Sequence, residues 1–487
     1  MVKFINTSLN KLLRHAARGA LLIHLIVFGS IGIVIIGGLV QWSIGQNRLA
    51  RQRSLKEMAF EIAEAGVDYY RWHLAHAPND FQDGTGSTGP YVHIFNNRAG
   101  EQIGTFTLTI TPPPTGSTMV IVESSGVTLE SPHAERVIRA RFAIPSLAKF
   151  AIAANADMRF GEGTEVFGPT HSNGGIRFDG LAHNLITSAR TSYDDPDHSG
   201  ANEFGVHTHD APTDPLPPAA APNRTDIFMA GRQFPVPAVD FTGIINDLAD
   251  IKTQAQASNG YYSSSGALGY HVTLQSNDTY ILKRVNSLQS PPQWCTNQLG
   301  QSGWGTWSIG TGGSAQTTLG THPFPSANVL FFEDHLWIDG QISSARLTIA
   351  SGKFPENPST NTSITINNDI IYSAYDGSAV LGLIAQNNIN VGLSSENDIR
   401  IDAALVAKNG RIGRYYYWTI CGSSYIRSQI TLWGMLATNQ RYGFAYTDGT
   451  GYQTRNITYD ASLLYAPPPS FPLTSDQYTL LSWEEVK

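Results

Sequence analysis

Cysteine is almost absent from this chain, whose 487 residues include only Cys295 and Cys421. Their wide separation excludes the clustered spacing of a zinc ribbon or a redox CxxC motif. Two interpretations stay open. In an exported chain, a disulfide between Cys295 and Cys421 would close a long loop and contribute up to ~4 kcal/mol. The alternative is that the two residues are unrelated buried thiols.

Charged residues are also few, at 15% of the sequence, and the formal net charge is −7. The chain therefore lacks the broad basic field that attracts nucleic-acid phosphates, and we predict no nucleic-acid partner. Gly and Pro are abundant, at 46 and 26 residues, and aromatic residues make up 10%. This composition favours a turn-rich, mainly β fold over a helical bundle, and the length predicts two or three structural units.

Motifs of common enzyme classes are missing as well. The sequence contains no GxSxG motif, no phosphate-binding loop, no HExxH motif and no EF-hand spacing. We therefore assign no catalytic residue and no cofactor, and we expect a protein that is not an enzyme.

A long segment near the N-terminus contains no charged residue. Residues 20–42 read ALLIHLIVFGSIGIVIIGGLVQW, without Asp, Glu, Lys or Arg. A helix of this length crosses ~30 Å of hydrocarbon, so the segment is predicted to span a membrane. A basic leader, residues 1–19, precedes it, and the first acidic residue is Glu57. This bias predicts a single-pass protein of the inner or cell membrane with an extracytoplasmic body.

Helical periodicity continues beyond the membrane span. Apolar residues recur at steps of three and four, namely Leu55, Met58, Ile62, Ala65, Tyr69 and Trp72. We therefore predict one retained helix over residues 20–76, about 84 Å long at ~1.5 Å per residue and ended by Pro78. The apolar stripe, with Tyr69 and Trp72, is expected to be buried.

The leader and the helix also carry a family pattern. The leader ends at Gly19, and residues 57–66 read EMAFEIAEAG. These features resemble PilX-type pilins of type IV pili, which carry a similar AxxxAEAG pattern. The resemblance implies cleavage by prepilin peptidase between Gly19 and Ala20. Such pilins usually have Glu at the fifth mature position, where this chain has His24; since minor subunits tolerate its loss, the resemblance implies a minor pilin. A plain signal anchor is the alternative.

Residues 77–147 have the alternating pattern of β-strands. The runs YVHIFN, IGTFTLTITP, STMVIVESSG and ERVIRARFAI are separated by Gly and Pro. They predict a small antiparallel sheet. A long helix followed by such a sheet is again similar to the pilin plan.

Residues 148–437 change to short Ile and Val runs between Asn-Gly, Asp-Gly and Asn-Asn turns, at intervals of roughly 15–25 residues. This pattern predicts a right-handed parallel β-helix, or solenoid, from Phe150 to about Ala437. Because the repeats are irregular, a β-sandwich or jelly roll is the alternative. Residues 187–232 are predicted as an inserted loop and 240–257 as a short helix, with the solenoid resuming near Asn328.

Residues 438–487 are predicted to form a C-terminal strap. Their segment 457–472, ITYDASLLYAPPPSFP, also resembles the tail of large PilX-like proteins. We expect Tyr459, Leu463, Leu464, Tyr465 and the prolines 467–469 to lie extended on the body.

Candidate metal ligands gather in the inserted loop; they are Asp194, Asp195, Asp197, His198, His207, His209 and Asp210. Calcium would favour the carboxylates, and zinc or another transition metal the imidazoles. His207 and His209 would point the same way in a strand. A solvated acidic loop is the alternative, so a divalent metal ion is a candidate ligand and not an assigned cofactor.

Other residues could serve in catalysis or binding, or could have a structural role alone. His171, Asp179 and His183 would supply the acid and base of a β-helix polysaccharide lyase, but no cluster of Arg and Lys accompanies them on a strand. Lone histidines in turns are better explained by structural hydrogen bonds. The aromatic residues Trp304, Trp307 and Tyr415–Trp418 would contact sugar or a protein, or pack in the core.

These observations predict a structural minor pilin or pilus-associated subunit that displays a large β body for assembly or adhesion. The expected partners are other pilin subunits, the pilus assembly machinery, the membrane through residues 20–42, and a surface glycan or protein. After assembly the chain would lie on the pilus or cell surface. The alternatives are a membrane-tethered, polysaccharide lyase-like β-helix enzyme and a bactofilin-like scaffold, although the cytoplasmic location of bactofilins conflicts with export.

Overall fold

The computed structural model describes residues 3–113, 117–241, 244–473, 475 and 477–486, with the backbone alone for residues 3–21, 244–247 and 465. The chain has a long N-terminal helix and is otherwise mainly β, with several sheets. It divides into two compact units. The first consists of Met1–Thr111, Val122–Ala140 and Ser482–Lys487, and the second of Pro112–Ile121 and Arg141–Leu481.

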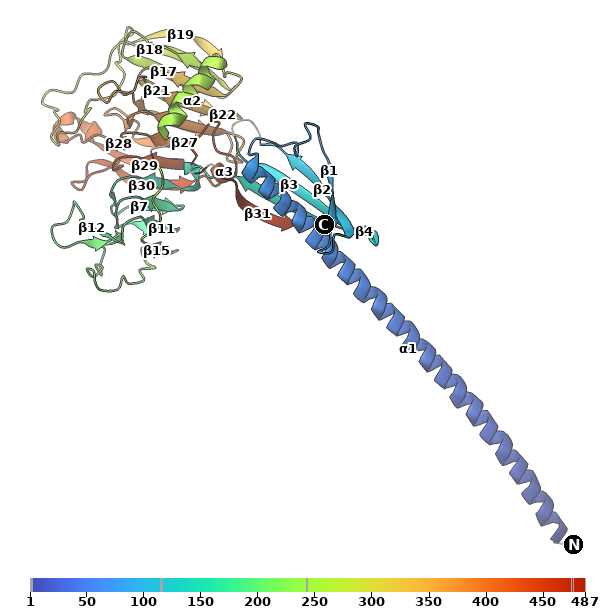
Figure 1. The fold of residues 1–487 in the computed structure, drawn as a ribbon. Helices are drawn as coiled ribbons and strands as arrows, with labels where there is room; N and C mark the ends of the chain where they lie inside the picture. Colours follow the sequence, from blue (N-terminus) through green and yellow to red (C-terminus); the bar gives the residue numbers. More distant parts are fainter. Residues whose placement is uncertain (1–2, 114–116, 242–243, 474, 476, 487) are drawn as a thin grey trace. The chain divides into compact units, whose positions relative to one another are not determined.

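Helix α1, Lys3–His76, dominates the first unit (Figure 1). It begins well before the predicted start near Leu21 and ends where expected, two residues before Pro78. The Tyr70 hydroxyl donates to the Asp80 carbonyl at 3.0 Å and fixes the turn that follows the helix. In the described part of the chain, α1 from Leu22 onward is the one helix long and apolar enough to cross a membrane.

Five strands in the order β1-β2-β3-β4-β31 form a sheet in the first unit: β1 Tyr91–Asn96, β2 Gln102–Thr111, β3 Val120–Thr128, β4 Ser131–Ala143 and β31 Thr479–Glu485. Buried and half-buried residues alternate strictly along β3, as expected when one face of a sheet packs on a helix. The last strand comes from the C-terminus, where Trp483 packs edge-on against Phe60 of α1 at 5.8 Å. The end of the chain, predicted as part of a strap, is therefore paired into this sheet.

The buried face of α1 differs from the predicted stripe. Its fully buried residues are Ala59, Ile62, Ala63 and Tyr70, whereas Trp72 is 58% exposed and Tyr69 is half-buried. The prediction that Trp72 is buried is therefore wrong. The reason is that the sheet packs on the small residues of the helix, which allow the closest approach of the two backbones.

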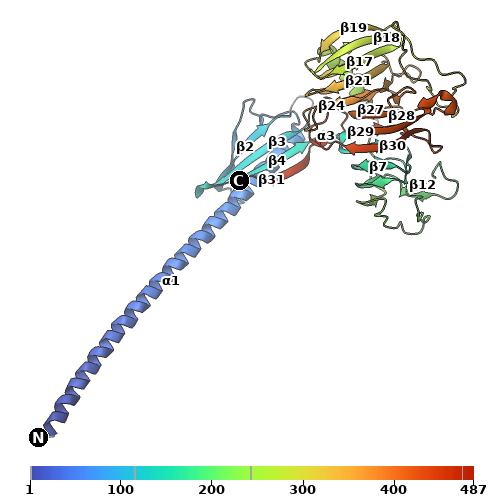
Figure 2. The same cartoon turned by 180° about the vertical axis from the view of Figure 1, so that it is seen from behind.

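The second unit contains short strands in stacked, mostly parallel pairs (Figure 2). The strands of its first arm, before helix α2, are β5 Ile152–Ala154, β6 Met158–Phe160, β7 Thr164–Phe167, β8 Thr170–Ser172, β9 Ile176–Phe178, β10 Leu181–Ala182, β11 Ile186–Ser188, β12 Ser192–Tyr193, β13 Glu203–Phe204, β14 Val206–His207 and β15 Arg232–Gln233. A 3-10 turn, η1 Leu147–Lys149, precedes them.

The second arm follows α2, Ile244–Ala257. Its strands are β16 Tyr261–Tyr262, β17 Gly269–Gln275, β18 Thr279–Val285, β19 Gln316–Pro323, β20 Val329–Phe332, β21 Leu336–Ile342, β22 Arg346–Ser351, β23 Ile364–Thr365, β24 Ile370–Tyr372, β25 Val380–Ala385, β26 Ile389–Val391, β27 Asp398–Ala407, β28 Ile412–Arg414, β29 Ile426–Thr438 and β30 Gly451–Tyr459. Two 3-10 turns, η2 Thr419–Cys421 and η3 Ser423–Tyr425, and the short helix α3, Ser462–Tyr465, complete it. Sheet pairing thus begins at Tyr261, well before Asn328, and includes β30 in the segment predicted as a strap.

The first strand of the first arm, β5, lies in the middle of this stack, between β29 and β8. One column of parallel pairs runs β16-β20-β22-β25-β27-β29-β5-β8-β11-β15. The first arm is therefore stacked directly on the last strands of the second arm, with Leu436 opposite Ile152 and Ile457 opposite Val166. Apolar residues of both arms form one continuous buried core.

Further elements pack on the stack or extend it. Leu248, Ile251 and Ala255 of α2 pack with Val329 and Phe331 of β20 in a second buried cluster. Strands β17, β18 and β19 pair antiparallel, and β17 also pairs parallel with β21. After α3, the carbonyls of Ala466 and Pro467 accept from Arg346 at 2.9 and 2.7 Å, which holds this part of the C-terminal segment on the second unit.

Candidate functional site

The first arm brings histidines and carboxylates together between β11 and β15. Strands β12 and β13 pair antiparallel, so the turn between them carries Asp195 and His198 back to Glu203. Strand β14 pairs parallel with β9, with His207 opposite Arg177. Two groups of side chains result, whose ligand atoms lie within 4.8 Å of one another: Asp195, His207 and His209, and His198, Glu203 and His209.

The inner members of this cluster are buried. His207 is fully buried, and the side chains of Asp195 and Glu203 are 2% and 3% exposed. His207 Nε2 lies 3.5 Å from Asp195 Oδ2, and His209 Nε2 lies 3.3 Å from Glu203 Oε1. Neither ring nitrogen of His207 makes a hydrogen bond, and Asp195 Oδ2 also makes none.

Charge and burial together lower the pKa of both Asp195 and His209. Burial raises the pKa of Asp195, but His207, the Asp197 N–H and Arg177 outweigh it and hold the pKa well below its usual range. Burial, Arg177 and His207 lower the pKa of His209, against the opposing effect of Glu203.

The predicted candidates separate into two sets. Asp195, His198, His207 and His209 come together, whereas Asp194 is exposed. Asp197 pairs with Arg441 and lies 3.7 Å from Arg159, and the Asp210 N–H donates to Thr208.

Glu203 was not among the candidates, although it lies within the cluster. The sequence carries no local signal for it, because the burial of Glu203 follows from the pairing of β12 with β13.

A groove of about 790 Å³ lies beside the cluster, and His209, Asp179 and Asp197 form part of its lining. Five arginines from distant segments also line it: Arg159, Arg177, Arg411, Arg441 and Arg455. No such cluster was visible in the sequence, because folding assembles it from both arms. The arginines already have partners: Arg177 pairs with Asp179 at 2.7 Å, and Arg455 donates to the Tyr452 carbonyl at 2.8 Å.

The three residues considered for polysaccharide cleavage have separate partners. His171, 2% exposed, contacts Thr187 Oγ1 and Asn173 Oδ1, each at 3.0 Å. His183 stacks on Phe167 at 3.9 Å. These contacts are those of structural histidines.

A second, smaller pocket of about 200 Å³ contains His271 and Asp339, which the sequence did not single out. His271 contacts Asp339 Oδ2 at 2.9 Å and Gln316 Oε1 at 2.6 Å. Burial raises the pKa of Asp339, but the contacts with His271 and Asn368 outweigh it and lower the pKa. His271 lies in β17 and Asp339 in β21, so the pair can be recognised only when these two strands are known to lie side by side.

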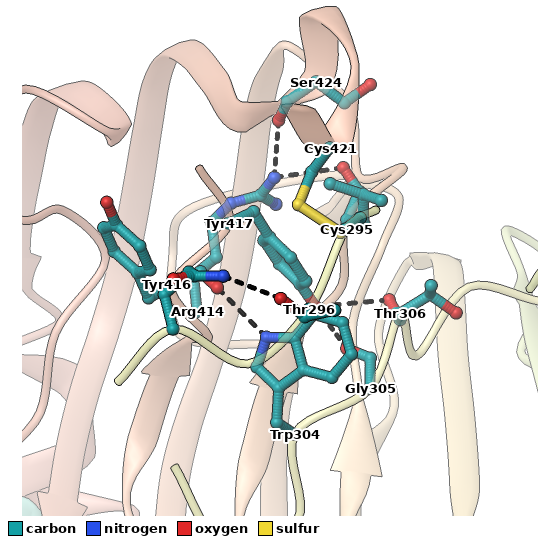
Figure 3. Close-up of a disulfide and its surroundings, with 12 residues drawn as sticks. Cys295, Thr296, Trp304, Gly305, Thr306, Arg414, Tyr416, Tyr417, Cys421 and Ser424 are labelled. Atoms are coloured by element: carbon teal, nitrogen blue, oxygen red, sulfur yellow. Dashed lines mark hydrogen bonds between the residues drawn. A yellow bond between two sulfur atoms is a disulfide. The ribbon is translucent and has the colours of Figure 1, made fainter. Parts of the chain in front are cut away.

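Cys295 and Cys421 form a disulfide within an aromatic cluster (Figure 3). Trp304 Nε1 donates to the Tyr416 carbonyl at 3.0 Å, and Arg414 donates to the Ser424 carbonyl at 2.7 Å. Burial lowers the pKa of Arg414 to about 10. The aromatics considered for binding are half-buried or buried here, namely Trp304, Trp307, Tyr415, Tyr416, Tyr417 and Trp418.

The residues considered for processing lie in α1. Gly19 and Ala20 are helical in backbone, and their side chains lie outside the described residues. His24 is exposed, as are nearly all side chains from Leu22 to Ser54. One apolar N-terminal helix of this kind fits a membrane anchor.

No protein family model matches the sequence, and no curated protein matches it. A solved structure similar to the chain is that of the competence-associated pilin ComZ from Thermus thermophilus. The two share 15% identity, with a TM-score of 0.29 over 89% of this chain and 98% of that chain. This degree of similarity does not establish a family for the chain.

Proposed function

We propose that this chain is a structural, non-enzymatic subunit of a type IV pilus-like apparatus, of the minor-pilin kind. The observation that carries the proposal is the division of α1 into two parts. From Leu22 to Ser54 its side chains are exposed and largely apolar, whereas Ala59, Ile62 and Tyr70 are buried under the sheet. An apolar helix half whose described side chains are exposed suits lipid before assembly and neighbouring helices afterwards.

The small-residue pattern of α1 supports the same proposal. Ala59, Ala63 and Gly66 are three of the five constant positions of the pilin-like AxxxAEAG pattern, and these three are buried. A Cβ at Gly66 would fall against Ser124 Oγ and lie 2.8 Å from the Phe106 ring. The pattern therefore has a physical purpose in this chain, because it lets the sheet approach the helix.

The body is proposed to lie outside the cytoplasm and on the pilus or cell surface. The Cys295–Cys421 disulfide supports this location, since disulfides persist in oxidising compartments. The basic residues before the membrane span support the same topology. Other pilin subunits and the assembly machinery would be the partners of α1.

We also propose that residues 150–459 form a parallel β-helix that displays a surface for assembly or adhesion. The continuous column of parallel pairs from β16 to β15 supports this fold. A body of this size exceeds what packing in a filament shaft requires. A surface glycan or a protein is the proposed ligand class, with the arginine-lined groove as its candidate site.

N-terminal sequencing by mass spectrometry of the native membrane or pilus-fraction protein tests the proposal. We expect a mature N-terminus at Ala20 and co-fractionation of the chain with sheared pili. Gly19→Val should block cleavage, so that the leader remains on the protein. Gly29→Ala is the control and should be cleaved normally, because nothing lies within 4 Å of a Cβ at this position. An intact Met1, or a cut beyond Trp42, would exclude the pilin assignment.

A turnover assay on acidic polysaccharides tests the non-enzymatic part of the proposal. We expect no product above background. Activity that is lost on replacing His171 or His183 would instead establish a membrane-tethered carbohydrate-active enzyme.

A further inference from the structure

We infer that Asp195, His207 and His209 bind a divalent transition-metal ion, and that Zn²⁺ is the ion their chemistry fits best. The inference rests on two independent observations. The ligand atoms of the three side chains lie within 4.8 Å of one another. Both ring nitrogens of the fully buried His207, and Oδ2 of Asp195, have no hydrogen-bond partner.

An unpartnered buried imidazole needs an explanation. Buried polar groups in folded proteins are almost always hydrogen-bonded, because an unsatisfied group carries the full cost of its lost hydration. His207 would avoid this cost at a surface position, yet β14 pairs with β9 and holds the residue inside. A bound cation satisfies Nε2 of the imidazole and the Asp195 oxygen at once.

The donor set selects the metal. Two imidazoles and one carboxylate suit Zn²⁺ and its borderline neighbours, whereas Ca²⁺ requires six or more oxygen ligands. Ligand atoms ~2.0–2.1 Å from a tetrahedral Zn²⁺ lie ~3.4 Å apart. The 3.5 Å between His207 Nε2 and Asp195 Oδ2 therefore already matches a zinc-bound pair.

The surroundings supply outer partners for these ligands. Glu203 Oε1 lies 3.3 Å from His209 Nε2, an arrangement in which a second carboxylate orients a metal-bound imidazole. On the other side, Arg177 lies 3.6 Å from Asp195 Oδ2 and competes for the same oxygen. Its guanidinium also pairs with Asp179 at 2.7 Å, so Asp179 retains Arg177 when the ion takes Asp195.

The ion would cross-link two parts of the inserted loop. Asp195 belongs to the turn between β12 and β13, whereas His207 and His209 lie at and after β14. Binding would therefore fix the hairpin against the stacked strands. Because His209 and Asp197 line the groove, the ion would also fix one wall of the groove next to the arginines.

Zinc titration of the full-length chain tests the inference. The detergent-solubilised protein, with any affinity tag removed, is stripped with a chelator and titrated with ZnCl₂ by calorimetry. We expect one Zn²⁺ per chain. His207→Ala, His209→Ala and Asp195→Asn should each weaken binding, by roughly 100-fold or more for the histidines. X-ray absorption should place nitrogen and oxygen ligands at ~2.0–2.1 Å from the bound zinc.

The exposed His198 is the matched control, since it belongs only to the second group of side chains. His198→Ala should retain the affinity within about threefold. Circular dichroism of each variant separates lost binding from misfolding, and the half-buried His209 is the variant least expected to disturb the fold. The proposed ligand set would be overturned if the wild type bound no stoichiometric zinc. It would also be overturned if folded His209→Ala kept the wild-type zinc affinity, or if His198→Ala lost as much affinity as the ligand variants.

Discussion

At position 126 the sheet and the helix of the first unit meet backbone to backbone. A Cβ at Gly126 would fall against the Ala59 carbonyl and lie 2.5 Å from the Ala63 nitrogen. Neither atom is at the end of a flexible side chain, so the sheet would have to move away from α1. The AxxxAEAG pattern of the helix and this glycine of β3 are two sides of one contact.

Gly126→Ala should therefore lower the stability of the first unit by about 1–3 kcal/mol, the usual cost of overpacking. Thermal unfolding of the detergent-solubilised protein, with limited proteolysis of the sheet, measures the effect. Gly45→Ala is the control, because nothing lies within 4 Å of a Cβ there. Equal stability of the two variants would contradict the close approach.

Asp278 links acidity to stability in the second unit. Burial raises the pKa of Asp278, but hydrogen bonds from Ser343 and Ser344 outweigh it and hold the pKa below its ordinary value of 3.8. The folded pKa lies below the unfolded one, so the stabilisation is present above pH ~4 and is lost as pH falls through the folded pKa. Asp278 also has a φ of 57°, a conformation that Asn tolerates.

Asp278→Asn should thus lower the melting temperature at pH 6 and flatten its decline between pH 5 and pH 2. Melting curves across this range, compared with those of the exposed Asp250→Asn, test the sign. If Asp278→Asn and the wild type lost stability in parallel on acidification, the assigned role of the carboxylate would be wrong.

At the scale of elements, local patterns in the sequence predicted the end of α1 and the strands of the small sheet. The buried face of α1 was mispredicted because hydrophobic periodicity favours large residues such as Trp72, whereas close backbone approach selects Ala59 and Gly66. Four of the five members of the histidine cluster, all except Glu203, were among the candidates predicted from the sequence. Glu203 was missed because its burial follows from pairing of β12 and β13, and pairing is not a local property.

The order of stacking could not be predicted either. Short apolar runs indicate which residues face a core, yet they carry no information on which run lies beside which. The contact of β29 with β5 joins residues near the end of the unit to residues near its start. For the same reason the arginine groove and the His271–Asp339 pair appear only in the folded chain.

The disulfide joins the long loop between β18 and β19, residues 286–315, to the turn η2. Trp304 and Tyr417 support the same junction, since the Tyr417 hydroxyl donates to the Gly305 carbonyl at 2.5 Å. With the two cysteines 126 positions apart, removing the cross-link should destabilise the second unit by about 2–4 kcal/mol. The double variant Cys295→Ser with Cys421→Ser avoids a free thiol.

Denaturant unfolding and limited proteolysis measure this effect, and cleavage should begin within residues 286–315. Reduction of the wild type should reproduce the result without any substitution. If the double variant and the reduced wild type resisted denaturant and protease as well as the oxidised wild type, aromatic packing alone would hold residues 286–315 in place.

For the whole molecule, the proposed anchor role of the exposed half of α1 implies that this half contributes little to folding. The described side chains before Ser54 are exposed, and among them Arg51 pairs with Glu130 at 2.9 Å. Such an exposed ion pair contributes about 0–1 kcal/mol. Burial under the sheet starts near Ala59.

A chain that starts at Ser54 should therefore stay in the soluble fraction with a melting temperature within about 2 °C of the full-length protein, because the Arg51–Glu130 pair that it loses is an exposed surface ion pair. A chain that starts at Val67 is the matched comparison, since it also loses Ala59, Ile62 and Ala63 and should expose the apolar face of the sheet. Ultracentrifugation and thermal melting distinguish the two. If the chain starting at Ser54 also aggregated, residues before it would be needed for folding, and α1 would not divide into an anchor and a sheet-bound half.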